Sequence, residues 1–284
     1  MYNEKITNNE DIVFVTDFLE NIKERDKDAF RIIVSSGVSE EKDAKELIID
    51  SFIDEKKTAI SPHTAYLHIK TLCDMRLLKK TRMSTGYRPF NILQLTLLGQ
   101  QVYRKLFRKE PPIQEHHKLL KEHSSVLHAY MIKDVKTILE KTGRFNKVTM
   151  GRKENRIELY DGRAIIPDII AYINNIPTYY IEVECGNHNQ EEFNAKCNKF
   201  VGLNRNVIIV GRSRAEITRL LKPQVDRFIR YKHREALQIS GTHIYLYSIT
   251  DLSNGKFTYH YDMSSDEPIY GFGRKAKEVN SDDE

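Results

Sequence analysis

Three acidic residues lie close together in a part of the chain that is otherwise apolar. Asp168 occurs in the run IIPDIIAYI, and Glu182 and Glu184 occur two residues apart in the run YYIEVE. Successive side chains of a strand point to opposite faces, so Glu182 and Glu184 share one face, and a hairpin would bring Asp168 alongside them. Burying such a cluster is costly unless a cation neutralises it. Clustered carboxylate oxygens suit Mg²⁺ or Mn²⁺, ions that orient a water nucleophile and stabilise charge on a phosphoryl oxygen.

The same spacing has a simpler interpretation. Ile181 and Val183 alternate with the two glutamates, which is typical of a strand with one apolar face and one solvated face. Lys196 and Lys199 follow in an expected helix, on neighbouring faces. Lys196 is the better placed to reach back to the carboxylates, although both lysines could instead belong to a solvated helix face. A tyrosine nucleophile is a further option, because the same two runs contain Tyr172, Tyr179 and Tyr180.

The second half of the chain alternates between helical and extended patterns. Apolar spacing predicts helices over 115–141, 191–200 and 216–231, and strands over 147–150, 156–160, 164–173, 178–184, 206–210 and 243–249. This order predicts a mixed sheet in an α/β fold, with the acidic runs on two neighbouring strands. The helix over 216–231 and its flanks are rich in Arg and Lys, which suits a solvated face or a path for a DNA backbone.

The first half reads as three helices, a hairpin and a closing helix. Helices are expected over 11–25, 44–52 and 62–76, strands over 77–81 and 91–97 around a turn at 84–86, and a helix over 98–107. Ser61 and Pro62 mark the start of the third helix, as an N-cap and a first-turn proline. This order resembles the winged helix-turn-helix family.

That resemblance implies DNA binding by the third helix and the hairpin. A recognition helix enters a major groove, and the wing contacts backbone phosphates. No acidic residue occurs between Asp74 and Glu110, where the wing lies. A winged helix that contacts protein instead is the other interpretation. The expected DNA-binding residues are His63, Thr64, Tyr66, Lys70, Lys79, Lys80, Arg82 and Arg88.

Composition and length set the outer limits. The chain has 284 residues, of which 40% are hydrophobic, and a net charge of +5, which suits two modest domains able to bury cores. Pro111-Pro112 marks a joint, so we expect a first domain over 1–110, a linker over 111–115, a second domain over 116–274 and a disordered tail over 275–284. No apolar run approaches the roughly 20 residues of a membrane span. With three cysteines and a polar N-terminus, a cytoplasmic protein without membrane contact is expected.

The acidic runs resemble the signature of the PD-(D/E)XK nuclease superfamily. The matching residues are Pro167-Asp168 and, after a hairpin, Glu182-Val183-Glu184. The common pattern ends in Lys, whereas this chain has Glu184. The resemblance implies a restriction-endonuclease-like mixed-sheet domain behind the N-terminal winged helix.

A narrower similarity covers nearly the whole chain. The segments SSVLHAYMIKDVKTIL, PD and EVECGN…KCNKF are similar to the replication-relaxation family of plasmids and integrative elements, and to the MobC-type conjugative relaxases. The similarity implies that Asp168, Glu182 and Glu184 bind a divalent ion and serve DNA strand cleavage at a transfer origin. By family position, His128 is expected to approach the same site.

These observations lead to two functional hypotheses of different classes. The first is an Mg²⁺- or Mn²⁺-dependent DNA endonuclease or nickase that acts at a specific site of a mobile element. In it Asp168 and Glu182 bind the ion, Glu184 is a third ligand or base, and Lys196 offsets charge. Its partners would be double-stranded DNA, with single-stranded DNA near the cut as an option, and mobilisation or replication accessory proteins. The second is a non-catalytic DNA-binding replication or mobilisation factor or repressor, which the missing lysine at position 184 favours. A restriction or transposon-end nuclease is a third option.

Overall fold

The computed structural model describes residues 22–52, 59–123, 125–152, 156–158, 162, 164–186, 189–198, 206–230 and 243–262. Contacts between residues divide the chain into two compact units. Unit 1 comprises Met1–Ser84 and Arg88–Lys121, and unit 2 comprises Thr85–Tyr87 and Glu122–Glu284. Most of the helix expected over 11–25, and the whole tail expected over 275–284, lie outside the described residues.

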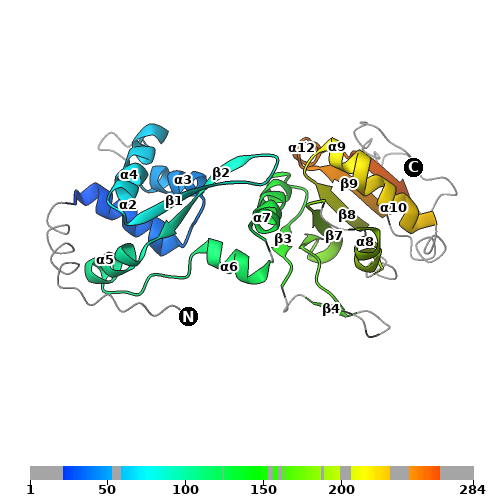
Figure 1. Ribbon diagram of the computed structural model, residues 1–284, viewed down its shortest axis with the longest axis horizontal. Coiled ribbons are helices and arrows are strands. Elements are labelled where there is room, and N and C mark those ends of the chain that lie inside the picture. Colours follow the sequence, from blue (N-terminus) through cyan, green and yellow to red (C-terminus); the bar gives the residue numbers. More distant parts are fainter. Residues whose placement is uncertain are drawn as a thin grey trace, which may run out of the picture. The chain divides into compact units, whose positions relative to one another are not determined.

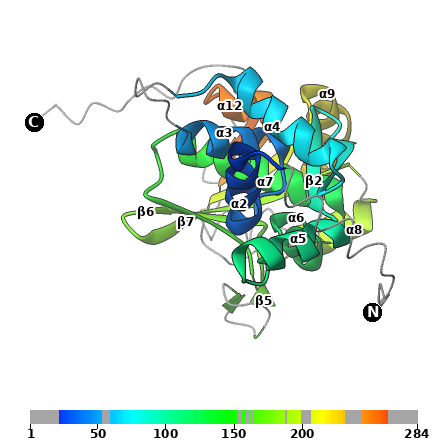
Figure 2. The ribbon, with the colours of Figure 1, turned by 90° about the vertical axis from the view of Figure 1, so that its left-hand side faces the viewer.

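Unit 1 contains helices and one antiparallel hairpin (Figures 1 and 2). Helices α2, α3 and α4 contact one another, and α3 and α4 also contact the hairpin. Apolar side chains from these elements fill one core that includes Phe30, Ile48, Ile69 and Leu93. The elements of unit 1 are α2 (Glu24–Ser36), α3 (Glu41–Ser51), α4 (Pro62–Asp74), β1 (Leu78–Ser84), β2 (Pro89–Leu95), α5 (Leu97–Phe107) and most of α6 (Glu115–Glu122).

Helix α4 begins where its sequence predicts. The Ser61 hydroxyl accepts a hydrogen bond from the Thr64 backbone N–H at 3.0 Å, which satisfies one of the unpaired donors at a helix start. Two positions differ from the expected amphipathic pattern. The apolar spacing over 62–76 predicts Leu67 inside and His68 outside. Leu67 is instead 45% exposed, and His68 turns inward, 2.7 Å from the Asp26 carboxylate. The polar pair with α2 therefore replaces an apolar contact that periodicity alone predicts.

The segment expected as a linker, 111–115, belongs to unit 1. The side-chain amide of Gln114 donates to the Leu93 carbonyl at 3.3 Å, and its oxygen accepts from the Leu95 backbone N–H at 2.8 Å. These bonds extend the pairing of β2 and attach the segment to the hairpin. The boundary between the units therefore falls between 121 and 122, after the expected joint.

The prediction of a single helix over 115–141 is wrong. Helix α6 ends at Glu122, and a separate helix, α7 (Val126–Lys141), begins after a new N-cap. The Ser125 hydroxyl accepts a hydrogen bond from the His128 backbone N–H at 3.1 Å. Serine at this position competes with helix continuation because its side chain can take the place of a backbone acceptor.

A mixed six-stranded sheet forms the centre of unit 2, in the order β10-β9-β8-β7-β6-β3. Strands β7, β8 and β9 are parallel, and the other pairs are antiparallel. The α/β fold class expected from the sequence is confirmed. Its strands are β3 (Lys147–Met150), β6 (Ile169–Ile173), β7 (Ile176–Glu184), β8 (Asn206–Gly211), β9 (His243–Ser248) and β10 (Tyr259–Asp262), beside a small sheet of β4 (Ile157–Glu158) and β5 (Ala164–Ile165).

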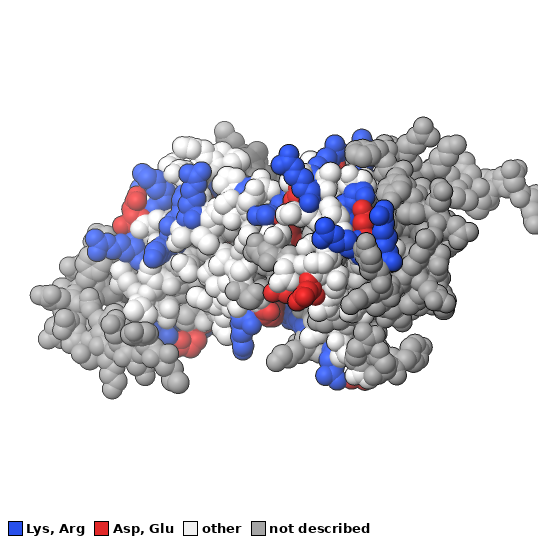
Figure 3. All heavy atoms as spheres, turned by 45° about the vertical axis from the view of Figure 1, so that its right-hand side comes forward, with Lys and Arg blue, Asp and Glu red and all other residues white. Residues whose placement is uncertain are grey.

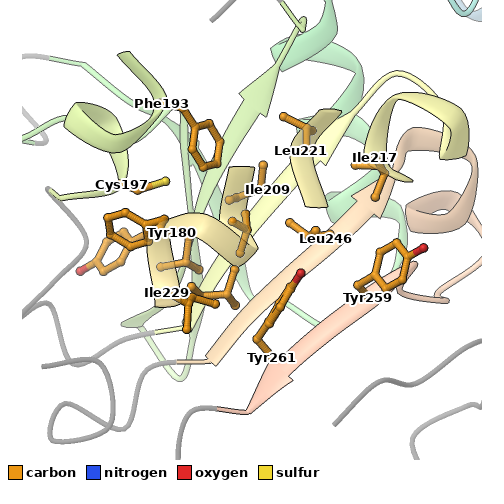
Figure 4. Packing of buried hydrophobic residues seen from close by; sticks show 14 of the residues in the cluster. Tyr180, Phe193, Cys197, Ile209, Ile217, Leu221, Ile229, Leu246, Tyr259 and Tyr261 are labelled. Carbon is orange, nitrogen blue, oxygen red and sulfur yellow. The ribbon is translucent and has the colours of Figure 1, made fainter. Parts of the chain in front are cut away.

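Helices cover both faces of this sheet (Figure 1). On one face lie α7 and α12 (Ile249–Ser253), whose apolar side chains pack on Ile181 and Val183 of β7. On the other lie α8 (Gln190–Cys197) and the continuous helical segment of α9 (Arg214–Glu216), the π-helical turn η2 (Ile217–Leu221) and α10 (Lys222–Phe228). Figure 4 shows Phe193 of α8 and Leu221 of η2 over the strand residues Tyr180 and Leu246. Both faces of β7 are therefore covered.

Within the described part of the chain, no helix combines the length and the apolar character needed to cross a membrane.

Candidate metal-binding site

Asp168 is held at the start of β6 by close backbone packing. The Gly151 backbone N–H donates to the Asp168 carbonyl at 2.8 Å. A Cβ atom at Gly151 would lie 1.6 Å from the Pro167 carbonyl oxygen, so only glycine fits this approach. Across the hairpin, the Val183 backbone N–H donates to the Asp168 carboxylate at 2.8 Å. The carboxylate is therefore directed toward β7, as the hairpin predicts.

Glu182 and Glu184 lie at the carboxyl end of β7 and are both buried. Their exposed fractions are 5% and 1%. They share the strand face of Tyr180, which packs in the core beneath α8. The interpretation of a solvated strand face is therefore wrong for these residues, because α8 covers that face and its lysine replaces solvent.

Lys196 joins the three carboxylates. It lies in the last turn of α8, and that helix begins with a reciprocal cap between Asn189 and Glu192. The Lys196 ammonium lies 2.6 Å from a Glu182 oxygen, 2.7 Å from a Glu184 oxygen and 3.9 Å from an Asp168 oxygen. The sequence indicated Lys196 as the residue that reaches back, and the geometry agrees. Lys199 lies outside the described residues.

One ammonium shared by three carboxylates cannot balance all of their charge. Burial raises the pKa of Glu182 to about 8, together with the charge of Asp168 and against the attraction of Lys196. Burial alone would lower the pKa of Lys196, but the charges of Glu182, Asp168 and Glu184 outweigh it and raise that pKa. With all three carboxylates ionised the cluster would carry more negative than positive charge, and a proton on Glu182 relieves this excess at neutral pH.

Two histidines lie on the α7 side of Asp168. The His128 Nε2 atom is 3.3 Å from the Asp168 carboxylate and 3.0 Å from the Val183 carbonyl. Both partners only accept, so Nε2 carries the proton. Burial would lower the pKa of His128, but its hydrogen bond with Asp168, the charge of Asp168 and the bond to the Val183 carbonyl together outweigh that and raise it. The His123 ring contacts the His128 ring edge to face, with centroids 5.5 Å apart.

The Asp168 carboxylate is ionised by its neighbours. Burial would raise its pKa, but the hydrogen bond with His128 and the charge of Lys196 outweigh that and lower it. Sequence reasoning placed His128 near this site and missed His123. In a continuous helix, residues five apart lie on different faces, so only the break between α6 and α7 makes the two rings neighbours. Ser125, a residue type that favours a helix start, lies between the two histidines and was the available signal for this break.

The residues fit a divalent cation of the Mg²⁺ or Mn²⁺ type. Asp168, Glu182 and Glu184 direct carboxylate oxygens at one buried point, and such oxygens are the preferred ligands of these ions. Burial and the charge of Asp168 raise the pKa of Glu182, and a second cation would take the place of the proton that they hold on this group. Binding between Asp168 and Glu182 requires the ammonium to move away from Glu182.

The expected DNA-binding residues of α4 and the hairpin differ in exposure. Thr64 and Tyr66 are half-buried, and Lys80 lies 5.3 Å above the Tyr66 ring. A groove beside the hairpin is lined by Lys80, Arg82, Pro89, Phe90 and Asn91. The exposed members of the expected set are His63, Lys70, Lys79, Lys80 and Arg82.

Three basic residues of this set are paired within unit 1, Lys70 with the exposed Asp74 at 3.8 Å and two others with buried glutamates. Arg88 donates to both oxygens of Glu40, at 2.7 and 3.2 Å, and Lys80 lies 3.1 Å from Glu41. Glu40 and Glu41 are buried, so these ion pairs hold the hairpin to the start of α3. A paired cation contributes less to phosphate binding than a cation with no carboxylate beside it.

Basic residues are also numerous around α9 and α10. Arg214 donates to the Asp251 carboxylate at 2.9 Å, and Lys222 lies 2.6 Å from Asp226, so these two stabilise unit 2. Lys and Arg side chains nevertheless cover more of the face drawn in Figure 3 than Asp and Glu side chains do. Such a surface is compatible with a nucleic acid backbone.

The chain has little similarity to known proteins. No family model and no curated protein matches the chain. Among solved structures, protein VC1899 from Vibrio cholerae is similar with a TM-score of 0.27 and 10% identity, over 87% of this chain and 55% of that one. The chain thus spans little more than half the length of that protein.

Proposed function

We propose that this protein is a metal-dependent DNA endonuclease that nicks one strand at a specific site. The observation that carries the proposal is the convergence of Asp168, Glu182, Glu184 and Lys196 at one buried point at the carboxyl end of β7. Ligands of open α/β sheets bind beyond the carboxyl ends of the strands. Carboxylates buried there with negative charge in excess are typical of a centre that binds a cation.

The residues of the centre would have separate tasks. A bound Mg²⁺ or Mn²⁺ supplies a Lewis acid that lowers the pKa of water and stabilises a phosphoryl oxygen. Asp168 is kept ionised and directed by the Val183 N–H and by His128. Glu184 accepts a proton from water or serves as a third ligand, and the Lys196 ammonium moves toward the phosphate as charge develops there.

Unit 1 would provide the DNA site. We assign it as a winged helix in which α4 enters a major groove and β1 and β2 contact the backbone. The exposed Lys79 and Arg82 of β1 support this assignment. With the resemblance to replication-relaxation proteins and MobC-type relaxases, the proposal extends to a mobile element, to mobilisation or replication accessory proteins as partners, and to the cytoplasm as the place of action.

A nicking assay tests the proposal. Supercoiled plasmid carrying the candidate origin is incubated with the protein and Mg²⁺ or Mn²⁺, and open-circular product is measured. We expect nicking that chelation abolishes and that Asp168→Ala reduces by at least about 10³-fold. Glu191→Gln, on the exposed side of α8, is the matched control and keeps full activity. Equal nicking by the Asp168→Ala protein would falsify the proposal.

A second function is favoured by one observation. Lys196 already pairs with all three carboxylates, and Glu184 replaces the lysine of the superfamily pattern. A cluster closed by its own ammonium suits a DNA-binding replication or mobilisation factor that retains a nuclease-like scaffold. This alternative predicts origin binding in a gel-shift assay with no nicking in either metal, and no stabilisation of the wild-type protein by Mn²⁺.

A further inference from the structure

A second group of metal ligands lies beside the carboxylate cluster. His123, His128 and Asp168 each offer one ligand atom, and these three atoms all lie within 4.8 Å of one another. The residues come from three places in the chain: the end of α6, the first turn of α7 and the start of β6. All three are half-buried, so an ion can reach them from solvent.

His123 is the unusual member of the group. Its Nε2 atom is buried and has no hydrogen-bond partner among the described residues. A buried imidazole nitrogen without a partner loses its bond to water and gains nothing in return, which destabilises the folded protein. Its ring is nevertheless held against the His128 ring. A ligand that accepts the lone pair of this nitrogen would remove the cost.

From this geometry we propose that His123, His128 and Asp168 form a separate site for a transition-metal ion such as Zn²⁺ or Co²⁺. Two imidazoles and one carboxylate suit these ions, whereas Mg²⁺ prefers oxygen ligands. Ligand atoms on one tetrahedral zinc ion, each about 2.1 Å from the metal, lie about 3.4 Å apart. The three atoms therefore need to approach by no more than about 1.4 Å, which side-chain rotation provides.

Binding changes one hydrogen bond in the structure. The His128 Nε2 proton now faces the Asp168 carboxylate and the Val183 carbonyl. If Nε2 were to bind the metal, the ring would take up the tautomer with its proton on Nδ1 and lose the Nε2 proton through solvent, and Asp168 would exchange its bond to the imidazole for a bond to the same ion. Asp168 keeps the hydrogen bond from the Val183 N–H, which continues to orient its carboxylate as metal-bound carboxylates require.

The proposal rests on the proposed function only in sharing Asp168, and its test does not use DNA. Co²⁺ is titrated into the metal-free full-length protein, and visible ligand-field absorption and binding heat are recorded. We expect the wild-type protein to give absorption from a nitrogen-containing site that Zn²⁺ quenches and Mg²⁺ does not. His123→Gln should weaken Co²⁺ binding by more than about tenfold, the effect of losing even a supporting group of a metal ligand.

A matched control uses another histidine pair. His243 Nδ1 lies 3.2 Å from His260 Nε2, so His243→Gln removes a histidine with a close neighbour and should leave Co²⁺ affinity unchanged. His128→Asn is a second variant with the same expected loss as His123→Gln, in case one substitution lowers the folded fraction. Unchanged affinity and absorption in both variants, or loss only in His243→Gln, would overturn the site.

The two proposals fail in different ways. A wild-type protein that nicks DNA with Mg²⁺ but gives no Co²⁺ absorption overturns the histidine site and leaves the nuclease proposal intact. A protein that binds Co²⁺ through His123 but does not nick DNA supports the histidine site and contradicts the nuclease proposal. Glu182→Gln separates them further, since it should abolish Mg²⁺-dependent nicking while the Co²⁺ absorption persists.

Discussion

Two buried acidic centres of unit 2 contrast in how their charge is satisfied. At the start of α12, the single carboxylate of Asp251 is 1% exposed. It accepts hydrogen bonds from Arg214 at 2.9 Å and from the hydroxyls of Ser248 and Thr258, each at 2.7 Å. At the end of β7, three carboxylates share the ammonium of Lys196.

The pKa values of the two centres move in opposite directions. Burial would raise the pKa of Asp251, but the bonds from Arg214, Thr258 and Ser248 outweigh it and lower that pKa to about 2. At the end of β7, burial and the charge of Asp168 raise the pKa of Glu182 to about 8. Burial of an acid is therefore not a sign of function by itself. An excess of carboxylates over cations is the more informative feature, because folding gains nothing from it.

The largest stability effect should come from removing the shared cation. Lys196→Met leaves three buried carboxylates without their ammonium, and we expect a loss of about 3–5 kcal/mol in the free energy of unfolding in chelator. Mn²⁺ at a concentration about 100-fold above its dissociation constant for the folded protein should restore about 2–3 kcal/mol of this loss. Urea unfolding with and without Mn²⁺ measures both values.

Lys222→Met is the matched control for that experiment. Lys222 has nearly the same side-chain exposure as Lys196, 21% against 22%, and it pairs with Asp226 four residues away. A pair of this type contributes about 0–1 kcal/mol. Equal losses in the two variants would show that the carboxylate cluster has no special charge imbalance, and the contrast between the two centres would fail.

Asp251→Asn should have the next largest effect. The substitution removes the charge that Arg214 and two hydroxyls surround, and we expect a loss of about 2 kcal/mol, the cost of breaking buried hydrogen bonds to a charged group. Metal ions should not restore it. Thermal and urea unfolding measure the loss, with Asp28→Asn as the control, since Asp28 pairs with Arg31 at an exposed site. A recovery on adding Mn²⁺ would mean that Asp251 belongs to a metal centre.

The sequence predicted much of the carboxylate cluster and little of the hydrogen-bond and packing contacts that support it. The segments after Asp168 and around Glu182 were predicted correctly as neighbouring strands, because alternation and turn residues are local signals. The prediction of a single strand over 164–173 is wrong, because that run divides into β5 and β6, which belong to different sheets, with Asp168 between them. Lys196 was found because helical spacing limits which lysine faces the strand. The alternation of Glu184 with valine did not predict that Glu184 is buried. Its strand face is buried because α8 packs over it, and the position of α8 depends on tertiary packing.

Other features depended on contacts between distant residues. His68 turns inward because its Nδ1 atom forms a hydrogen bond with the Asp26 carboxylate of another helix, and nothing near His68 in the sequence indicates that partner. The Asp251 network joins residues 37 apart in the chain, so Asp251 read as an ordinary polar residue. His123 needed the break between α6 and α7, which a periodic apolar pattern concealed. Local propensity misses each of these because the deciding partner is remote.

The pH dependence of Asp251→Asn sharpens the same comparison. The pKa of Asp251 is about 2 in the folded state and about 3.9 in an unfolded chain. Its contribution to stability is therefore fully present above about pH 4 and is lost as the pH falls toward 2. The difference in unfolding free energy between the wild-type protein and Asp251→Asn should stay constant from pH 7 to pH 5 and shrink below pH 4. A constant difference down to pH 2.5 would mean that the loss comes from altered packing and not from charge.

The smallest effect should come from Glu182→Gln, and it should have the opposite sign to Asp251→Asn. The substitution keeps the volume of the side chain and replaces a carboxyl that, with a pKa of about 8, is mostly protonated at pH 7. Lys196 retains Glu184 at 2.7 Å, so its ammonium stays paired. We expect the metal-free variant to be unchanged or more stable by up to about 1 kcal/mol, because a neutral amide takes the place of a mostly neutral carboxyl and removes the remaining repulsion without exposing a cation. Urea unfolding in chelator at pH 7 measures this. A loss above about 2 kcal/mol would show that Glu182 is a structural acid like Asp251, and the charge excess would no longer distinguish the two centres.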